Sequence, residues 1–277
     1  MCKAPRAAYP AHRIVSIIAA FFGLVPTVFA DSALFDLTPW QLAATAAIFV
    51  WSGFVRAGLG FGGAVLTLPL LLMVDGDPLF WLPIISMHLI LFSAITLRSR
   101  MGHVDWQALR RSLPWVLPGK LIGVFGLLSL PNRWLVLIVY SITAFYAIQW
   151  IIGLRIRSRS RWSDCLLLFG GGYFSGTSLS GSPLIVSVYA HQVERNSLRN
   201  TLFVLWILLV SIKLAAFAWF DIDLQWLGML LLFPVAAIGH LLGMRAHDYL
   251  LDRARLFKIV IGTAMAVIAA MGFLRVL

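Results

Sequence analysis

Residues 40–74, WQLAATAAIFVWSGFVRAGLGFGGAVLTLPLLLMV, are a long apolar segment with a single charged residue, Arg56. As one helix it would be roughly 50 Å long, whereas the hydrocarbon core of a bilayer is about 30 Å thick. A glycine-rich run, Gly58-Leu59-Gly60-Phe61-Gly62-Gly63, interrupts it near the middle. Such backbone is tolerated at membrane depth only where protein or a cavity satisfies its polar groups. The stretch therefore predicts a glycine-broken re-entrant hairpin in a membrane protein.

The composition of the chain agrees with a membrane protein. Of its 277 residues, 61% are hydrophobic and only 12% are charged, and the mean hydropathy is +0.91. A soluble domain has about a quarter of its residues charged. The connections between apolar segments are short, so the chain predicts one membrane domain and no separate soluble domain.

The net charge of +11 also fits a nucleic-acid-binding protein. Such a protein needs a basic face on a soluble module. Here the basic residues lie mainly in loops between apolar segments, and an excess of Lys and Arg in cytoplasmic loops is the rule for membrane proteins. We therefore expect no nucleic-acid partner.

The N-terminal residues 1–30 allow two interpretations. Three basic residues precede an apolar run from Ile14 to Val25, and small residues stand shortly before Asp31. This pattern is typical of a cleaved signal peptide, and it also fits an uncleaved first helix that is short for a full span. Both interpretations place Asp31 on the outer side.

Seven further apolar segments follow residues 40–74. Cys165–Tyr189 is broken by glycine and serine, with Gly170-Gly171-Gly172 and then Gly176 to Pro183, so it resembles the first stretch. The other six are each about the length of one spanning helix. They are Leu79–Leu97, Leu113–Leu130, Trp134–Leu154, Thr201–Phe220, Leu224–Met244 and Leu256–Leu274.

An internal duplication with a period of 118 to 120 residues relates the two broken segments. Gly58 corresponds to Gly176, Trp106 corresponds to Trp226, and the run GKLIG at residues 119–123 corresponds to GHLLG at residues 239–243. Each pair alone is weak evidence for a duplication, because small residues four apart are common in packed membrane helices. Their shared order predicts two homologous halves, at residues 31–154 and 155–277.

The loop charges distinguish parallel halves from inverted ones. Eight simple spans would make the halves parallel and would divide the basic loop residues almost evenly. If each broken segment is a re-entrant hairpin, each half crosses the membrane three times and the halves are inverted. One side then collects fourteen basic residues, while the other keeps Arg133 and Arg275. The fourteen are Arg98, Arg100, Arg110, Arg111, Arg155, Arg157, Arg159, Arg161, Arg195, Arg199, Arg245, Arg253, Arg255 and Lys258.

This division favours the hairpin arrangement, with the basic loops in the cytoplasm. We predict an all-α polytopic membrane protein of two inverted repeats, each a glycine-broken re-entrant hairpin plus three transmembrane helices. Inverted repeats with broken helices recur among transporters. We expect the protein in the inner membrane of a bacterial cell.

A family resemblance extends over about residues 40–275. The run Gly58 to Ala64, followed by Leu68-Pro69-Leu70-Leu71, resembles the first-repeat signature of the TauE/SafE family of sulfite-exporter-type permeases. Gly102 to Trp106 resembles a loop motif of that family. Gly176 to Pro183 resembles its second-repeat signature, with Ser180 and Ser182 where glycine is common. The resemblance implies transport of sulfite, sulfonates or related small organic anions, usually outward.

Ionisable residues inside the apolar segments indicate a substrate site independently. Arg56, Lys120 and Lys213 lie within them, whereas every Asp and Glu lies at a segment edge or in a loop. An ionisable residue at this depth usually faces a cavity or a partner, and cations without carboxylates favour an anionic substrate. The hairpin tips add hydroxyls and helix N-termini. The candidate substrate-binding residues are Arg56, Gly58, Gly60, Gly62, Gly63, Lys120, Ser178, Ser180, Gly181, Ser182, Lys213 and His240.

Structural alternatives exist for these residues. Lys213 can extend to the membrane surface, Arg56 can bind helix-end carbonyls, and the hydroxyls can satisfy broken backbone. His88 carries little weight, because a lone intramembrane histidine is more often structural.

Other function classes have less support. No metalloprotease, hydrolase or phosphate-loop motif is present, so we expect no enzyme. Cys2 and Cys165 have no metal or redox spacing, and we expect neither cofactor nor metal. A membrane scaffold and a proton-coupled uptake permease remain alternatives to anion efflux. The expected partners are a small anion and membrane lipid, and self-association into a homo-oligomer stays open.

Overall fold

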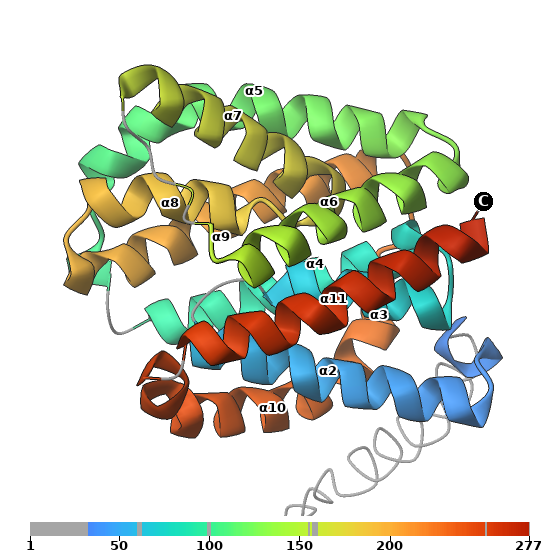
Figure 1. Ribbon diagram of the computed structural model, residues 1–277. Helices are drawn as coiled ribbons and strands as arrows, with labels where there is room; N and C mark the ends of the chain where they lie inside the picture. Colours follow the sequence, from blue (N-terminus) through green and yellow to red (C-terminus); the bar gives the residue numbers. More distant parts are fainter. Residues whose placement is uncertain are drawn as a thin grey trace, which may run out of the picture.

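The computed structural model describes residues 33–59, 63–98, 101–154, 156, 160–252 and 254–276 (Figure 1). The signal peptide or first helix predicted at residues 1–30 lies outside the described residues. Within them the chain is helical, in the order η1 (Ala33–Asp36), α2 (Pro39–Leu59), α3 (Gly63–Val74), α4 (Pro78–Leu97), η2 (Met101–His103), α5 (Trp106–Ser129), α6 (Asn132–Ile152), α7 (Arg161–Ser178), α8 (Ser182–Gln192), α9 (Arg195–Trp219), α10 (Trp226–Asp252) and α11 (Ala254–Val276).

Six helices of the described part are long and apolar enough to cross a membrane, namely α4, α5, α6, α9, α10 and α11. They are the six predicted spans, so the all-α polytopic class is confirmed. The helices extend beyond the apolar segments. For example, α5 begins at Trp106 and not at Leu113, because the Asp105 side chain accepts a hydrogen bond from the Ala108 N–H (2.9 Å) and caps the helix.

The outer surface of the helices is apolar. On α5, Leu121 and Phe125 are 57% and 69% exposed, and on α10, Leu230 and Leu241 are 61% and 56% exposed. A soluble protein rarely leaves so many large apolar side chains in water. These faces are the ones that contact lipid in a multi-pass membrane protein.

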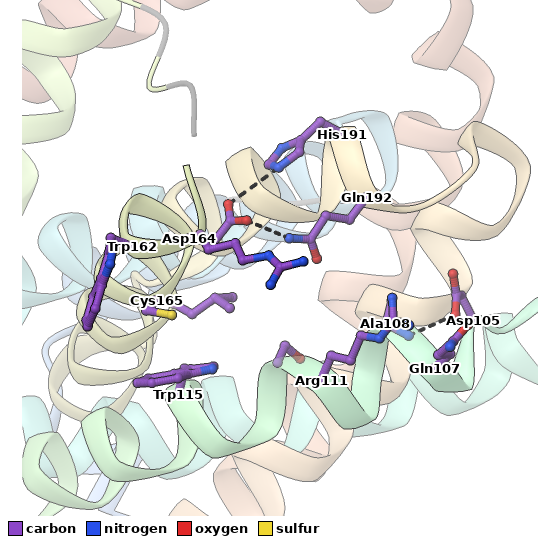
Figure 2. A pocket seen from close by; sticks show the side chains of 13 residues that line it. Asp105, Gln107, Ala108, Arg111, Trp115, Trp162, Asp164, Cys165, His191 and Gln192 are labelled. Atoms are coloured by element: carbon purple, nitrogen blue, oxygen red, sulfur yellow. Dashed lines mark hydrogen bonds and ion pairs between the residues drawn. The ribbon is translucent and has the colours of Figure 1, made fainter. Parts of the chain in front are cut away.

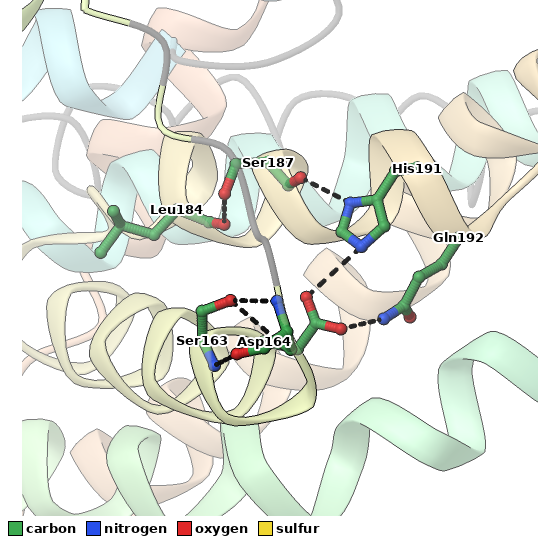
Figure 3. Close-up of polar contacts among 7 residues, drawn as sticks. Ser163, Asp164, Leu184, Ser187, His191 and Gln192 are labelled. Atoms are coloured by element: carbon green, nitrogen blue, oxygen red, sulfur yellow. Dashed lines mark hydrogen bonds and ion pairs between the residues drawn. The ribbon is translucent and has the colours of Figure 1, made fainter.

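Both broken segments fold back on themselves. Near the start of α2, Gln41 Nε2 donates to the carbonyl of Val74, the last residue of α3 (2.9 Å). Near the start of α7, Asp164 Oδ2 accepts from Gln192 Nε2 at the end of α8 (2.8 Å; Figure 3). Each segment is therefore a helical hairpin whose two outer ends are joined by a side chain, as the sequence predicted.

The two hairpins open at opposite ends of α5. The second opens beside the start of α5, because Asp164 and Gln192 line one cavity with Asp105. The first opens beyond the end of α5, where Asn132 Nδ2 donates to the carbonyl of Gly76 (3.1 Å). This is the arrangement that inverted halves require, and the inverted repeats and their orientation in a membrane stay a prediction.

Helices of the two halves pack in a reciprocal pattern. Helix α2 packs on α10 and α5 packs on α7, while α6 lies against α11 and α4 against α9 (Figure 1). By the duplication, α2 corresponds to α7 and α5 corresponds to α10. The long helix of each hairpin (α2 or α7) thus packs against the second of the three spanning helices of the other half (α10 or α5).

This close helix packing explains the repeated glycine motif, GKLIG at residues 119–123 and GHLLG at residues 239–243. A Cβ atom on Gly119 of α5 would lie 2.1 Å from the carbonyl oxygen of Phe169 on α7. A Cβ atom on Gly239 of α10 would lie 1.8 Å from the carbonyl oxygen of Val50 on α2. Only glycine allows the backbones to come so close. GKLIG and GHLLG are therefore two copies of one close-packing motif.

Cysteine labelling tests the predicted topology. In a protein whose own cysteines are replaced by serine, Gly76→Cys and Glu194→Cys are expected to react with an impermeant maleimide from opposite sides of the membrane. Gly76 suits this test because a Cβ atom there would have no neighbour within 4 Å. Labelling of both positions from the same side would restore the parallel-repeat arrangement.

Candidate functional site

The second break is a tight connection between α7 and α8. Leu179 follows the end of α7 in the left-handed conformation (φ 57°), and its N–H bonds back to the carbonyl of Ser175 (3.3 Å). A Cβ atom on Gly181 would lie 1.8 Å from the carbonyl oxygen of Gly171, so the tip needs glycine there. The break places the carbonyl end of α7 beside the N-terminus of α8.

Two buried lysines from different halves meet the end of α7. Lys120 on α5 and Lys213 on α9 are both 0% exposed. Lys120 Nζ donates to the carbonyl (2.9 Å) and the hydroxyl (3.2 Å) of Ser175, and Lys213 Nζ donates to the carbonyl of Thr177 (3.3 Å). The negative end of a helix dipole favours positive charge. Because Lys213 is fully buried, it does not extend to the membrane surface, and that alternative is wrong for it.

Arg56 lies at the first break. Its Nη1 donates to the carbonyl of His88 (3.2 Å) and its Nη2 to the hydroxyl of Ser52 (3.2 Å). Its Nε is buried and has no hydrogen-bond partner among the described residues. A Cβ atom on Gly63, the first residue of α3, would lie 3.5 Å from that Nε. This edge of the guanidinium thus lies close to the N-terminus of α3.

His240 lies close to the same break. Its ring stacks on Phe92 (centroids 4.9 Å apart), and the Arg56 guanidinium lies 5.0 Å from the centroid of the same ring. Its Nδ1 is buried without a hydrogen-bond partner among the described residues. His240 therefore belongs to the first break as Lys120, its counterpart in the duplication, belongs to the second. Phe92 was not a candidate, since a phenylalanine in an apolar helix carries no signal in the sequence.

The serines of the second break bond to its own backbone. The hydroxyl of Ser178 donates to the carbonyl of Phe174 (3.2 Å), and that of Ser180 donates to the carbonyl of Ser178 (3.1 Å). Ser182 begins α8 and is half-buried. Gly58 and Gly181 are buried, while Gly60 and Gly62 lie outside the described residues.

The tips of the two hairpins lie in one hydrophobic cluster. Val65 and Leu66 of α3 pack there with Leu184 of α8, and Phe174 of α7 lies against them. The structure thus brings the two breaks together. Two surface cavities lie elsewhere, at the opening of each hairpin, and Arg56, Lys120 and Lys213 line neither of them. One cavity that holds all three cations stays a prediction.

The charged side chains that the structure shows as buried are all cations. Arg56, Lys120 and Lys213 are buried, whereas no Asp or Glu whose side chain the structure describes is. In the described ranges, carbonyl groups, serine hydroxyls and aromatic rings contact these cations, and no carboxylate does. Within the same ranges, no group of three or more His, Cys, Asp and Glu side chains is placed to hold a metal ion.

Comparison with known proteins places the chain in a family. The model of the sulfite exporter TauE/SafE family matches residues 44–271, which include most of the first hairpin and all of the second. Comparisons with curated proteins and with solved structures gave no match. The TauE/SafE family is a family of membrane transporters for sulfur-containing anions. With its six long apolar helices and this match over most of its length, the chain is a multi-pass membrane protein that belongs to the sulfite exporter TauE/SafE family.

Proposed function

We propose that this protein carries a small anion, such as sulfite, a sulfonate or a related organic anion, outward across the membrane. The observation that supports the proposal is the set of three buried cations at the two breaks, with no buried carboxylate in the described ranges. A buried ion without a counter-ion costs several kcal/mol. An anionic substrate would supply the missing charge when it binds.

The proposed site combines three kinds of anion ligand. The guanidinium of Arg56 has the planar geometry that matches two oxygens of an oxyanion, and its Nε–H has no hydrogen-bond partner in the described part of the chain. The ammonium groups of Lys120 and Lys213 act as point charges. The first turns of α3 and α8 add backbone N–H groups that have no partner within their helix.

Substrate binding would change the hydrogen-bond acceptors of Lys120 and Lys213. Lys120 and Lys213 now donate to carbonyls at the end of α7. An oxyanion is a stronger acceptor than a carbonyl, because charge-assisted hydrogen bonds are roughly twice as strong as neutral ones. We propose that substrate oxygens take over these donors, which would loosen the end of α7 and open the break.

A counterflow assay in proteoliposomes tests the substrate class. Liposomes loaded with unlabelled sulfite are expected to take up labelled sulfite, and external taurine or sulfoacetate is expected to compete more strongly than acetate. Protein-free liposomes and the Arg56→Gln protein provide the background. Competition by acetate as strong as that by taurine or sulfoacetate would contradict selectivity for sulfur oxyanions, and an absence of any sulfite counterflow would favour the scaffold alternative.

Proton-coupled uptake of the same anions is the second candidate. The observation in its favour is the buried Nδ1 of His240, which has no hydrogen-bond partner in the described part of the chain. A histidine beside a transported anion can bring in a proton near neutral pH. In the same proteoliposomes, an inward proton gradient would then drive sulfite accumulation, and His240→Gln would remove that response.

A further inference from the structure

A cavity of about 1000 Å³ lies where the second hairpin opens, between α5, α7 and α8 (Figure 2). Arg111 and Trp115 line it from α5, and Arg161 and Trp162 line it from the first turn of α7. We call it the arginine cavity. It is separate from the buried cations of the proposed substrate site, none of which lines it.

The carboxylates of the arginine cavity have hydrogen-bond partners, whereas its arginines have none among the described residues. Asp164 accepts from Gln192 Nε2 (2.8 Å) and faces His191 Nε2 (3.4 Å), as Figures 2 and 3 show. Asp105 caps α5. Neither Arg111 nor Arg161 has a hydrogen bond or ion pair with another residue that the structure describes. Two guanidinium groups are thus available to an anion.

Close packing separates the arginine cavity from Lys120. Deeper along α5 and α7, a Cβ atom on Gly172 would lie 2.2 Å from the carbonyl oxygen of Val116, and one on Gly119 would lie 2.1 Å from that of Phe169. Val116 is 0% exposed. Backbone therefore meets backbone between the cavity and the lysine, so the cavity is not an entrance to the substrate site along these two helices.

An exposed apolar surface continues from the mouth of the cavity. On α7, Trp162, Leu166 and Phe169 follow one helical face and are 79%, 71% and 40% exposed. On α5, Ile122 and Phe125 are 52% and 69% exposed. Such a surface lies in the hydrocarbon region, and tryptophans mark the membrane interface above it. A soluble anion would use the arginines alone, whereas a lipid would use both the arginines and this surface.

We propose that the arginine cavity binds the headgroup phosphate of an anionic phospholipid. Arg111 and Arg161 bind the phosphate oxygens, Trp115 and Trp162 contact the glycerol region, and the acyl chains lie on the apolar faces of α5 and α7. Basic pockets between transmembrane helices are suited to anionic headgroups. Because this site joins α5 to both helices of the second hairpin, a bound lipid would stabilise the hairpin opening.

Native mass spectrometry of the full chain tests the proposal. Protein released from nanodiscs of phosphatidylcholine with one fifth phosphatidylglycerol is expected to retain phosphatidylglycerol preferentially. The Arg111→Gln/Arg161→Gln protein is expected to lose about 30-fold in this preference, because each basic residue near an anionic lipid contributes roughly fivefold. The matched control is Arg98→Gln/Arg195→Gln, which removes two exposed arginines of the same basic set that do not line the cavity.

Three results would overturn the proposal. One is equal loss of phosphatidylglycerol from both double variants, which would indicate that the basic loop residues attract anionic lipid in general. Another is equal retention of the two lipids by the unmodified protein. The third is displacement of the lipid by millimolar inorganic phosphate, which would make the cavity a site for soluble anions. Both arginines are exposed, so size-exclusion profiles of the variants are expected to match that of the unmodified protein.

Discussion

Replacing Lys120 by methionine is expected to abolish anion transport without destabilising the protein. Loss of a buried charge that binds a charged ligand costs about 2 kcal/mol or more, so substrate affinity is expected to fall at least about 30-fold. Substitution of a buried ion by an apolar group of similar volume is often neutral or stabilising. The carbonyl of Ser175 also keeps a partner, because Leu179 N–H donates to it (3.3 Å). The melting temperature is therefore expected to stay unchanged or to rise.

Sulfite counterflow and thermal unfolding in detergent, measured on the same preparation, check both parts of this prediction. Arg56→Gln is expected to give the same loss of transport. The matched control is Arg133→Gln, which removes an exposed cation in the first turn of α6. A lower melting temperature with normal flux in Lys120→Met would show that the lysine only caps α7. Normal affinity in both Lys120→Met and Arg56→Gln would contradict the proposed site.

Two glycines three residues apart on α5 are expected to respond oppositely to alanine. A Cβ atom on Gly123 would lie 2.3 Å from the carbonyl oxygen of Tyr173 and 2.9 Å from the Cα of Gly176, so Gly123→Ala must push α5 and α7 apart. Overpacking of this kind costs about 1–3 kcal/mol. A Cβ atom on Gly126 would meet no atom within 4 Å. Gly126→Ala is therefore expected to stabilise α5 by about 0.5–1 kcal/mol.

Unfolding curves of the two variants in one detergent measure this difference directly. Gly123→Ala is also expected to reduce transport, because it displaces the helix that carries Lys120 from the break it contacts. Equal stability of the two variants would contradict the close packing of α5 and α7. The Gly239 motif on α10 is expected to behave in the same way against α2.

Much of the fold was predictable because a bilayer imposes few choices on a sequence. The six spans followed from hydropathy, and the hairpins followed from glycine runs in segments too long for one crossing. Helix ends were less predictable. Hydropathy reports the part of a helix in lipid, whereas α5 continues through Arg110 and Arg111 because Asp105 caps it outside the apolar segment.

The candidate site was predictable only in part. Arg56, Lys120 and Lys213 stood out because charge inside an apolar segment is costly, and the structure buries all three. Their partners could not be predicted, because the contacts of Lys120 with Ser175 and of Lys213 with Thr177 depend on how distant helices pack. The contacts of Phe92 with Arg56 and His240 could not be predicted either, because they also depend on helix packing. The hydroxyls of Ser178 and Ser180, predicted for substrate, bond to local backbone in this structure.

The proposed direction of transport is argued from charge and membrane potential. In the described ranges the site has no buried carboxylate of the kind that binds sodium or relays protons. An anion leaves a negatively charged cell spontaneously, since the field is worth about 2.3 kcal/mol per charge per 100 mV. A potential of about 150 mV then sustains roughly a 300-fold gradient of a monovalent anion. We therefore propose electrogenic efflux without an obligatory coupling ion.

Electrogenic efflux can be tested by sulfite flux through purified protein in proteoliposomes under an imposed potassium diffusion potential. We expect that flux follows the potential, reverses when the potential is reversed, and disappears in Lys120→Met. Flux that is indifferent to the potential but responds to a pH step would contradict electrogenic efflux, and would point to proton coupling through a histidine.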